Sequence, residues 1–259
     1  MKTLSILTLT LTLFTACQST PTATQPRVDV EIAKENLLQI NNKNIILPTD
    51  SSQLLFVQTD DWNTKEGTLQ RYERVTFNDK RWVKVGKPIS IILGRNGLGW
   101  GKGLHTTPKN AKYIKKEGDG RAPAGLFTLG NGFGYSNFEI NFPYSTYKRT
   151  DHCVDDSNSQ WYNKIIDSTE VDKDYKSFEH MKLTNHLYRY GITVNHNPEQ
   201  IKNAGSCIFM HIRSENGKGT AGCTAMKEEK IINILKWLNQ EKKPLLLQLP
   251  KEEILNINI

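Results

Sequence analysis

Short apolar runs bounded by turn-forming residues recur along the chain from about residue 50 onward. Runs of this length that are rich in aliphatic and aromatic residues are typical of strands. They predict strands at 53–59, 69–77, 81–85, 88–93, 124–129, 191–194, 207–210 and 245–249. Asn78-Asp79 favours a hairpin between the second and third of these runs. The chain is therefore expected to form a mainly β domain.

One segment near the C-terminus has helical spacing instead. Its apolar residues are Ile231, Ile234, Leu235 and Leu238. Acidic residues stand near its start, and Lys242-Lys243-Pro244 stands at its end, which is the charge order that a helix favours. This predicts one of the few helices of the domain, directly after Cys223. Five glycines between 94 and 103 predict a turn-rich loop.

The N-terminus reads as an export signal. Lys2 precedes an apolar run over 4–14, and Thr15-Ala16 then precedes Cys17. Residues 1–16 are therefore expected to be a signal peptide, with Cys17 the lipidated first residue of the mature chain, because a cysteine after small residues resembles a bacterial lipobox. The alternative is ordinary cleavage nearby, with Cys17 lost in the discarded peptide.

The segment after Cys17 predicts a flexible tether. Residues 18–26 are polar, with two prolines and no apolar periodicity. The expected organisation is a signal peptide over 1–16, a lipidated tether over 17–49 and one domain over 50–259. The apolar run at the N-terminus is shorter than the roughly 20 residues that span a bilayer. Gln18 is consistent with sorting to the outer membrane, which would place the domain in the cell envelope, facing the periplasm.

Composition and charge limit the classes of molecule that the protein is expected to bind. Hydrophobic residues make up 37% and charged residues 24% of the 259 residues, as in an ordinary soluble domain, expected here to be monomeric. The net charge of +7 favours an anionic partner, and peptidoglycan carboxylates and acidic lipid headgroups are the nearest ones in an envelope. Export argues against nucleic acid. The histidines lack metal-ligand spacing, so neither a metal nor a cofactor is predicted.

A histidine and a cysteine close in sequence carry the candidate chemistry. His211 ends the apolar run 207–210, and Thr220-Ala221-Gly222-Cys223 follows a loop with two glycines. A thiol ionises weakly at neutral pH, so a catalytic cysteine needs a base, which His211 would supply. Gly222 leaves backbone N–H groups near the sulfur for an oxyanion. The alternative is a small buried cysteine beside a core histidine.

The same residues resemble the active-site motif of the L,D-transpeptidase (YkuD-like) catalytic domain, in which a histidine precedes Ser/Thr-x-Gly-Cys. The resemblance extends over about residues 50 to 250. It includes the segments 118–127, 154–157, 178–181 and 205–211, and suggests a divergent branch of that family. It implies a β-sandwich-like fold, with Cys223 as nucleophile and His211 as proton acceptor and donor.

The resemblance also implies a reaction. Cys223 would form a thioester with a peptidoglycan stem peptide and pass it to an amine, in the biogenesis of the cell wall and the maintenance of cell shape. With water as acceptor the protein would be an L,D-carboxypeptidase. An alternative of another class is a peptidoglycan-binding lipoprotein that keeps the fold without turnover.

One position departs from the family pattern. Most members have an arginine two residues after the cysteine, where this chain has Ala225. Arg213 and Arg121 are candidates to bind a substrate carboxylate instead, because a guanidinium can hold a carboxylate with two hydrogen bonds. The alternative for each is an ordinary exposed charge. Thr220 in the motif and His180 in the segment 178–181 are further candidates to line the cleft.

Three cysteines remain beyond Cys17. Exported chains meet oxidising conditions, so pairing has to be considered. If Cys223 stays free to react, Cys153 and Cys207 are left as a candidate disulfide. The alternatives are two buried free thiols, or a bond between Cys207 and Cys223 that would abolish the nucleophile.

Overall fold

The computed structural model describes residues 37–40, 43–74 and 81–254. The predicted signal peptide, Cys17 and most of the predicted tether lie outside these residues. Strands dominate the described part, which confirms a mainly β protein. Its helices are α2 (Glu228–Trp237) and two 3-10 turns, η1 (Gln240–Lys242) and η2 (Lys251–Glu253).

The largest sheet returns to its own starting strand. Its order is β12-β13-β14-β5-β4-β3-β15-β7-β6, and β12 also pairs with β7. The long strand β7 makes this possible, because its first half pairs with β15 and its second half with β12. The strands are β3 (Gln53–Thr59), β4 (Glu66–Arg74), β5 (Trp82–Ile92), β6 (Leu98–Trp100), β7 (Ala122–Gly134), β8 (Tyr144–Thr146), β12 (Tyr190–Val194), β13 (Phe209–Ile212), β14 (Thr224–Met226) and β15 (Leu245–Pro250).

The main hydrophobic core combines residues from both faces of the closed sheet with the buried face of α2. Its members come from strands all around the ring, and the fully buried ones include Leu54, Leu55, Leu69, Leu126, Phe127, Met210 and Leu247. Burying one such side chain stabilises the fold by about 1.5–3 kcal/mol. The apolar runs at 53–59 and 245–249 are these core strands, β3 and β15, paired in parallel as direct neighbours.

Two predicted strands turn out to be one. The runs 81–85 and 88–93 belong to β5, which pairs with β4 along most of its length. The register shifts where Gly86 adopts a φ of +68°, so a bulge lies at the point where the sequence suggested a break. The predicted turn residues Asn78 and Asp79 lie outside the described residues. The glycine-rich stretch 94–103 contains one short strand, β6, within its loop.

The predicted strand at 207–210 is displaced by two residues. Strand β13 begins at Phe209, because Cys207 has a φ of +54° and so cannot continue a strand. Along β13 the side chains alternate: Met210 and Ile212 enter the main core, and Phe209 enters a second core on the other side of the sheet. Both faces of β13 are buried, which explains a continuous apolar run without alternation.

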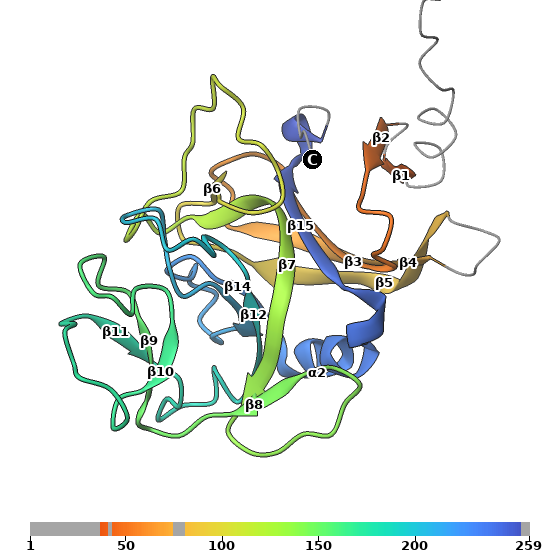
Figure 1. Ribbon diagram of the computed structural model, residues 1–259. Coiled ribbons are helices and arrows are strands. Elements are labelled where there is room, and N and C mark those ends of the chain that lie inside the picture. The colour runs from red at the N-terminus through yellow and green to blue at the C-terminus, as the bar shows by residue number, and fades with distance from the viewer. Residues whose placement is uncertain (1–36, 41–42, 75–80, 255–259) are drawn as a thin grey trace, which may run out of the picture.

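The helix prediction is confirmed, with one difference in position. In α2 the residues Ile231, Ile234 and Leu235 are buried, and the helix contacts β12 and β13 (Figure 1). It does not follow Cys223 directly, because the three residues of β14 come first.

The predicted tether extends too far. Strands β1 (Leu37–Ile40) and β2 (Lys43–Ile46) pair antiparallel, and Ile45 in β2 and Leu47 just after it belong to the main core. These two side chains are only 3% and 2% exposed. The folded part therefore begins before residue 50, because Ile45 and Leu47 are buried, although Ile46 between them is 54% exposed.

A small second sheet lies beside the closed one (Figure 1, left). Its strands are β9 (Asp151–Val154), β10 (Ile165–Asp167) and β11 (Phe178–His180), with β9 in the middle. A disulfide joins Cys153 in β9 to Cys207 just before β13. Between the two sheets lies the second core, which contains Phe133, Cys153, Met181, Tyr188, Cys207, Phe209 and Cys223. The small sheet is thus fixed against the segment that carries the candidate chemistry.

Candidate active site

Two adjacent parallel strands position the candidate catalytic dyad, which is Cys223 and His211. Strands β13 and β14 pair so that Met210 lies opposite Thr224 and His211 opposite Ala225. Met210 is buried in the main core, and the Thr224 hydroxyl donates to the side-chain oxygen of Gln248 at 2.6 Å. His211 and Ala225 face the other way, since neighbouring residues of a strand alternate between its faces. The loop 213–223 connects the strands and ends at Cys223.

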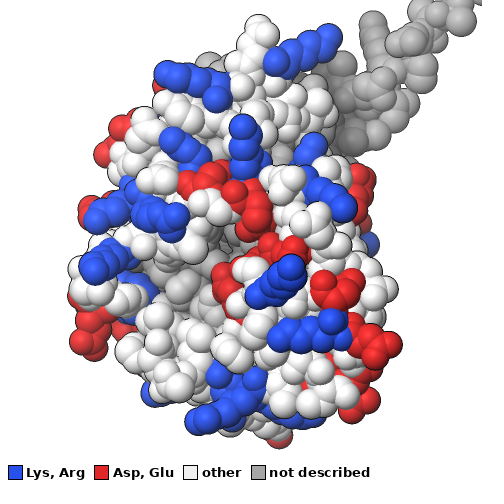
Figure 2. All heavy atoms as spheres, turned by 90° about the vertical axis from the view of Figure 1, so that its left-hand side faces the viewer, with Lys and Arg blue, Asp and Glu red and all other residues white. Residues whose placement is uncertain are grey.

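A cavity of about 240 Å³ lies on this outer face of the closed sheet. The dyad and the residues around it line it together, namely Glu179, Leu183, Leu187, Tyr188, His211, Ser214, Asn216, Lys218, Gly219, Thr220, Ala221, Cys223 and Ala225. The structure therefore brings Cys223, His211 and Thr220 into one site. Figure 2 views the molecule from the left of Figure 1, where the small sheet lies, and shows a hollow bordered by acidic and basic side chains.

The Cys223 thiol is buried and held by two backbone groups. Its side chain belongs to the second core, and the residue is 5% exposed. The Phe209 N–H donates to Sγ at 3.3 Å, and the thiol donates to the Cys207 carbonyl at 3.6 Å. Burial raises the pKa of Cys223 far above its usual value, and the negative charge of Glu179 raises it further. The resting sulfur is therefore a neutral thiol.

His211 is held in one tautomer. Its Nδ1 lies 2.8 Å from the Ile212 carbonyl oxygen, which can only accept, so Nδ1 carries the proton. Nε2 consequently keeps its lone pair and can act as a base. Burial lowers the pKa of His211 to about 4, so the resting imidazole is neutral. The ring of Tyr188 packs edge-on against it, with 5.1 Å between the ring centroids.

A strained backbone position supports the thiol. Cys207 adopts a φ of +54°, which is uncommon for a residue other than glycine. Its N–H donates to the side-chain oxygen of Asn163 at 3.0 Å. The amide nitrogen of Asn163 in turn donates to the carbonyls of His196 and Asn197 at 2.8 and 2.9 Å. This network and the disulfide together keep the Cys207 carbonyl at the sulfur of Cys223.

Thr220 organises the turn before the cysteine. Its hydroxyl donates to the Cys223 carbonyl at 2.6 Å and accepts from the Gly222 N–H at 3.1 Å. A Cβ on Gly222 would lie 3.0 Å from the Arg121 carbonyl oxygen, which is a close approach. Gly222 therefore serves packing, and its N–H is engaged within the turn. The Gly222 N–H is thus already paired in this conformation, and the role of the Cys223 N–H toward an oxyanion stays a prediction.

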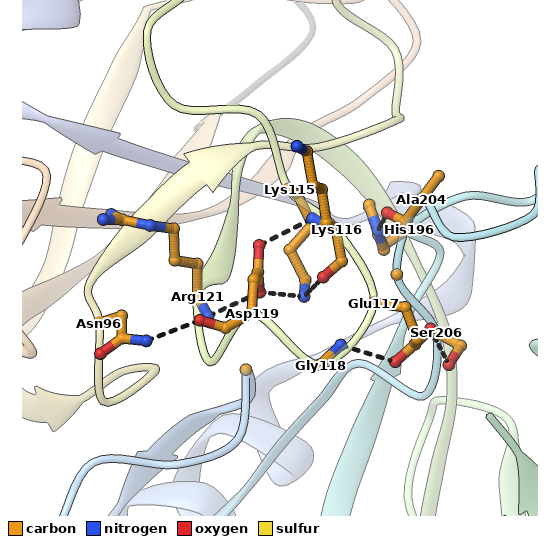
Figure 3. Close-up of polar contacts among 12 residues, drawn as sticks. Asn96, Lys115, Lys116, Glu117, Gly118, Asp119, Arg121, His196, Ala204 and Ser206 are labelled. Atoms are coloured by element: carbon orange, nitrogen blue, oxygen red, sulfur yellow. Dashed lines mark hydrogen bonds and ion pairs between the residues drawn. The ribbon is translucent and has the colours of Figure 1, made fainter. Parts of the chain in front are cut away.

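Neither arginine candidate lines the cavity. The Arg121 guanidinium donates to the carbonyls of Trp62 and Leu98 at 3.0 and 2.7 Å and to the side chain of Asn63 at 2.9 Å. It also stacks over the Tyr113 ring at 4.5 Å. Its side chain points away from Glu117 and Ser206 in Figure 3. Its role is therefore structural, because backbone carbonyls take up the donors that a substrate carboxylate would need.

Arg213 lies on a separate depression. Its neighbours there are His186, Ile212, Glu215, Lys227, Glu228 and Glu229, and none of these residues lines the cavity of Cys223. Arg213 is the first residue after β13, beyond His211 and Ile212, and its N–H donates to the Met226 carbonyl at 2.7 Å. The prediction that it binds substrate in this cavity is not supported by its position.

His180 also faces away, and its neighbour takes the place expected for it. His180 is exposed and packs edge-on against His152, with 4.9 Å between the ring centroids. Because side chains alternate along β11, Glu179 faces the cavity. The Tyr188 hydroxyl donates to the Glu179 carboxylate at 2.6 Å. Sequence analysis missed both Glu179 and Tyr188, because it predicted no strand over 178–180.

The segment 115–121 forms a rigid polar turn beside the motif (Figure 3). The Asp119 carboxylate accepts from the ammonium of Lys115, and from the N–H groups of Lys116 and Arg121, at 2.7 to 2.9 Å. The Glu117 carboxylate accepts from the Tyr162 hydroxyl at 2.5 Å and from the Ser206 hydroxyl at 2.7 Å. These bonds fix the Arg121 carbonyl against which Gly222 packs.

Within the described part of the chain, no group of three or more histidine, cysteine, aspartate or glutamate side chains is arranged to hold a metal ion. In the same residues no helix is long and apolar enough to cross a membrane. No protein-family model matches the sequence. A search of curated proteins also finds no match.

Proposed function

We propose that the protein is an L,D-transpeptidase-like cysteine acyltransferase that acts on peptidoglycan stem peptides. The observation that supports this best is the placement of Cys223 and His211 on one cavity, with the Nδ1 proton of His211 held by the Ile212 carbonyl. A nucleophile, an oriented base and a carbonyl that orients the base are the parts that thiol catalysis needs. The closed sheet with its α2 helix would be this family's catalytic fold.

The first half-reaction would form a thioester. Nε2 of His211 takes the proton of Cys223 as Sγ attacks the carbonyl at the third residue of a tetrapeptide stem. The protonated imidazole then donates to the terminal D-alanine amine as the carbon–nitrogen bond breaks. Proton transfer has to accompany the attack, because the resting thiol and imidazole are both neutral. The Phe209 N–H stabilises the thiolate as it develops, since it already donates to Sγ.

The second half-reaction would transfer the acyl group to an amine or to water. Transfer to an amine gives a cross-link, and transfer to water gives L,D-carboxypeptidase activity. The exposed Lys218 lies on the cavity wall and suits an anionic stem peptide, as does the net charge of +7. We place this activity in the cell envelope, with the chain anchored to the outer membrane through a lipid on Cys17.

A non-catalytic, peptidoglycan-binding protein is the second candidate. It is favoured by the neutral, buried thiol and by Ala225, which leaves no arginine on the strand beside His211. Incubation of the purified mature protein with defined tetrapeptide muropeptides, followed by mass analysis of the products, separates the candidates. A dimer linked between third residues supports transpeptidation, and a shortened tripeptide alone supports the carboxypeptidase. Unchanged muropeptides that nevertheless bind the protein would support the second candidate and contradict the enzyme.

A further inference from the structure

One acidic side chain shares the cavity with the nucleophile. Glu179 lines the same cavity as Cys223 and His211, and its negative charge acts on the thiol. Formation of the thioester does not use this carboxylate, because Cys223 and His211 provide the nucleophile and the base. A half-buried carboxylate in this position is costly unless it meets a donor or a cation.

The small sheet holds Glu179 in place. Glu179 lies opposite Cys153 in the pairing of β11 with β9, so both side chains leave the same face of that sheet. Cys153 is bonded to Cys207, whose carbonyl accepts the thiol of Cys223. The disulfide therefore fixes the distance between the carboxylate and the nucleophile, although the two come from different sheets.

The Glu179 carboxylate can accept further hydrogen bonds. Among the described residues its one hydrogen-bond partner is the Tyr188 hydroxyl, which donates at 2.6 Å. The Tyr188 ring also packs against His211, so the carboxylate, the phenol and the imidazole form one wall. Repulsion from two other carboxylates, Asp155 and Glu117, contributes to the raised pKa of Glu179. This wall therefore favours a cationic group.

We propose that Glu179 binds the primary ammonium group of the acyl acceptor and takes a proton from it, in the second half of the proposed transpeptidation. The ammonium gives one proton to the Glu179 carboxylate and becomes a neutral amine. The amine nitrogen attacks the thioester carbonyl, so that a carbon–nitrogen bond forms and the carbon–sulfur bond to Cys223 breaks. The second proton passes through Nε2 of His211 to the departing thiolate. Glu179 then releases its proton to water.

Burial supports this proton transfer. It raises the pKa of Glu179 to about 7, against which the hydrogen bond from Tyr188 acts. A carboxyl group in this range is a better proton acceptor at neutral pH than an exposed glutamate. Water as acceptor carries no ammonium group, so hydrolysis of the thioester would not depend on this contact. The residue therefore decides between cross-linking and hydrolysis.

The test is the ratio of aminolysis to hydrolysis of the thioester. A synthetic tetrapeptide donor is mixed with the mature, disulfide-bonded protein and with glycinamide, the amine acceptor, at a series of concentrations. The aminolysis product and the hydrolysis product are both quantified by mass. Glu179→Gln keeps the size of the side chain and an acceptor for Tyr188, but cannot hold a charge or take the proton. The ratio is expected to fall about ten- to hundredfold, as for loss of one charge-assisted hydrogen bond. Tyr188→Phe should lower it less.

Two controls separate the possible outcomes. Glu215→Gln removes the same charge from an exposed residue of the nearby loop that does not line the cavity, and should leave the ratio unchanged. The other source of an ammonium group is the donor peptide itself. The rate of thioester formation is therefore compared between two donor peptides, one with a free side-chain amine and one whose side-chain amine is acetylated.

The inference is overturned if Glu179→Gln changes aminolysis and hydrolysis equally, or if it slows thioester formation only for the donor with the free amine. The second result would assign Glu179 to the donor. Failure of the wild type to form any thioester would instead contradict the proposed function, and this inference with it. Melting curves of each variant exclude loss of folding as the cause.

Discussion

Removal of the disulfide between Cys153 and Cys207 should destabilise the protein strongly. The bond closes a loop with a sequence separation of 54 residues. In the chain-entropy model, a closed loop of this length contributes about 4 kcal/mol to the free energy of unfolding. For a domain of this size, each kcal/mol moves the melting temperature by roughly 2–4 °C. Cys153→Ala/Cys207→Ala should therefore melt about 8–16 °C lower than the oxidised wild type.

The same bond should also affect the site. It ties β9, and through it Glu179, to the Cys207 carbonyl at the sulfur of Cys223. The double variant should therefore remain able to form the thioester, but with a lower ratio of aminolysis to hydrolysis. A single Cys153→Ala variant should behave worse, because its free Cys207 thiol shares the buried core with Cys223 and can pair with it.

Differential scanning calorimetry of the wild type, the reduced wild type and the double variant measures the effect. The reduced wild type should melt close to the double variant, since both lack the same cross-link. A double variant that melts within about 2 °C of the oxidised wild type would refute the reasoning. Detection of three alkylatable thiols in the oxidised mature domain would refute it more simply.

Three further results are expected. His211→Ala should lose as much turnover as Cys223→Ala, because nucleophile and base act as a unit, and product analysis that shows an active His211→Ala variant would count against this. Arg121→Lys should lower the free energy of unfolding, measured by urea titration, by roughly 1–3 kcal/mol, because lysine cannot keep both hydrogen bonds to the Trp62 and Leu98 carbonyls. It should not slow thioester formation, because these contacts lie outside the cavity. Stability should fall as pH drops from about 6.5 towards 4, because burial lowers the pKa of both His196 and His211 to about 4, so that the unfolded chain binds more protons than the folded one over this range. Glu179, whose pKa is raised, opposes this effect only partly. A melting temperature that rises as the pH drops over this range would contradict the prediction.

The sequence predicted the strands and the helix wherever local pattern decides them. Ile231, Ile234 and Leu235 form the buried face of α2 as their spacing indicated. The bulge at Gly86 and the strained Cys207 were missed, because each depends on partners far away in sequence. A positive φ at a cysteine has no sequence signal, and here the side chain of Asn163 supports it.

The candidate site was predictable in its centre and not at its edges. Cys223, His211 and Thr220 share one cavity as their motif suggested. The choice of Arg121 failed because a charge says nothing about which backbone carbonyls surround it in the fold. His180 was a candidate to line the cleft, but Glu179 lines it instead, because side chains alternate along β11, a strand that was not predicted.

The central claim is that Cys223 carries an acyl group during turnover. Its most direct test is the intact mass of the protein, quenched in acid after brief incubation with a tetrapeptide donor. The wild type should gain the mass of the donor less its terminal D-alanine, and peptide mapping should place this mass on Cys223. Cys223→Ala should gain nothing. A wild type that leaves the donor untouched, or an equal mass gain on Cys223→Ala, would contradict the account.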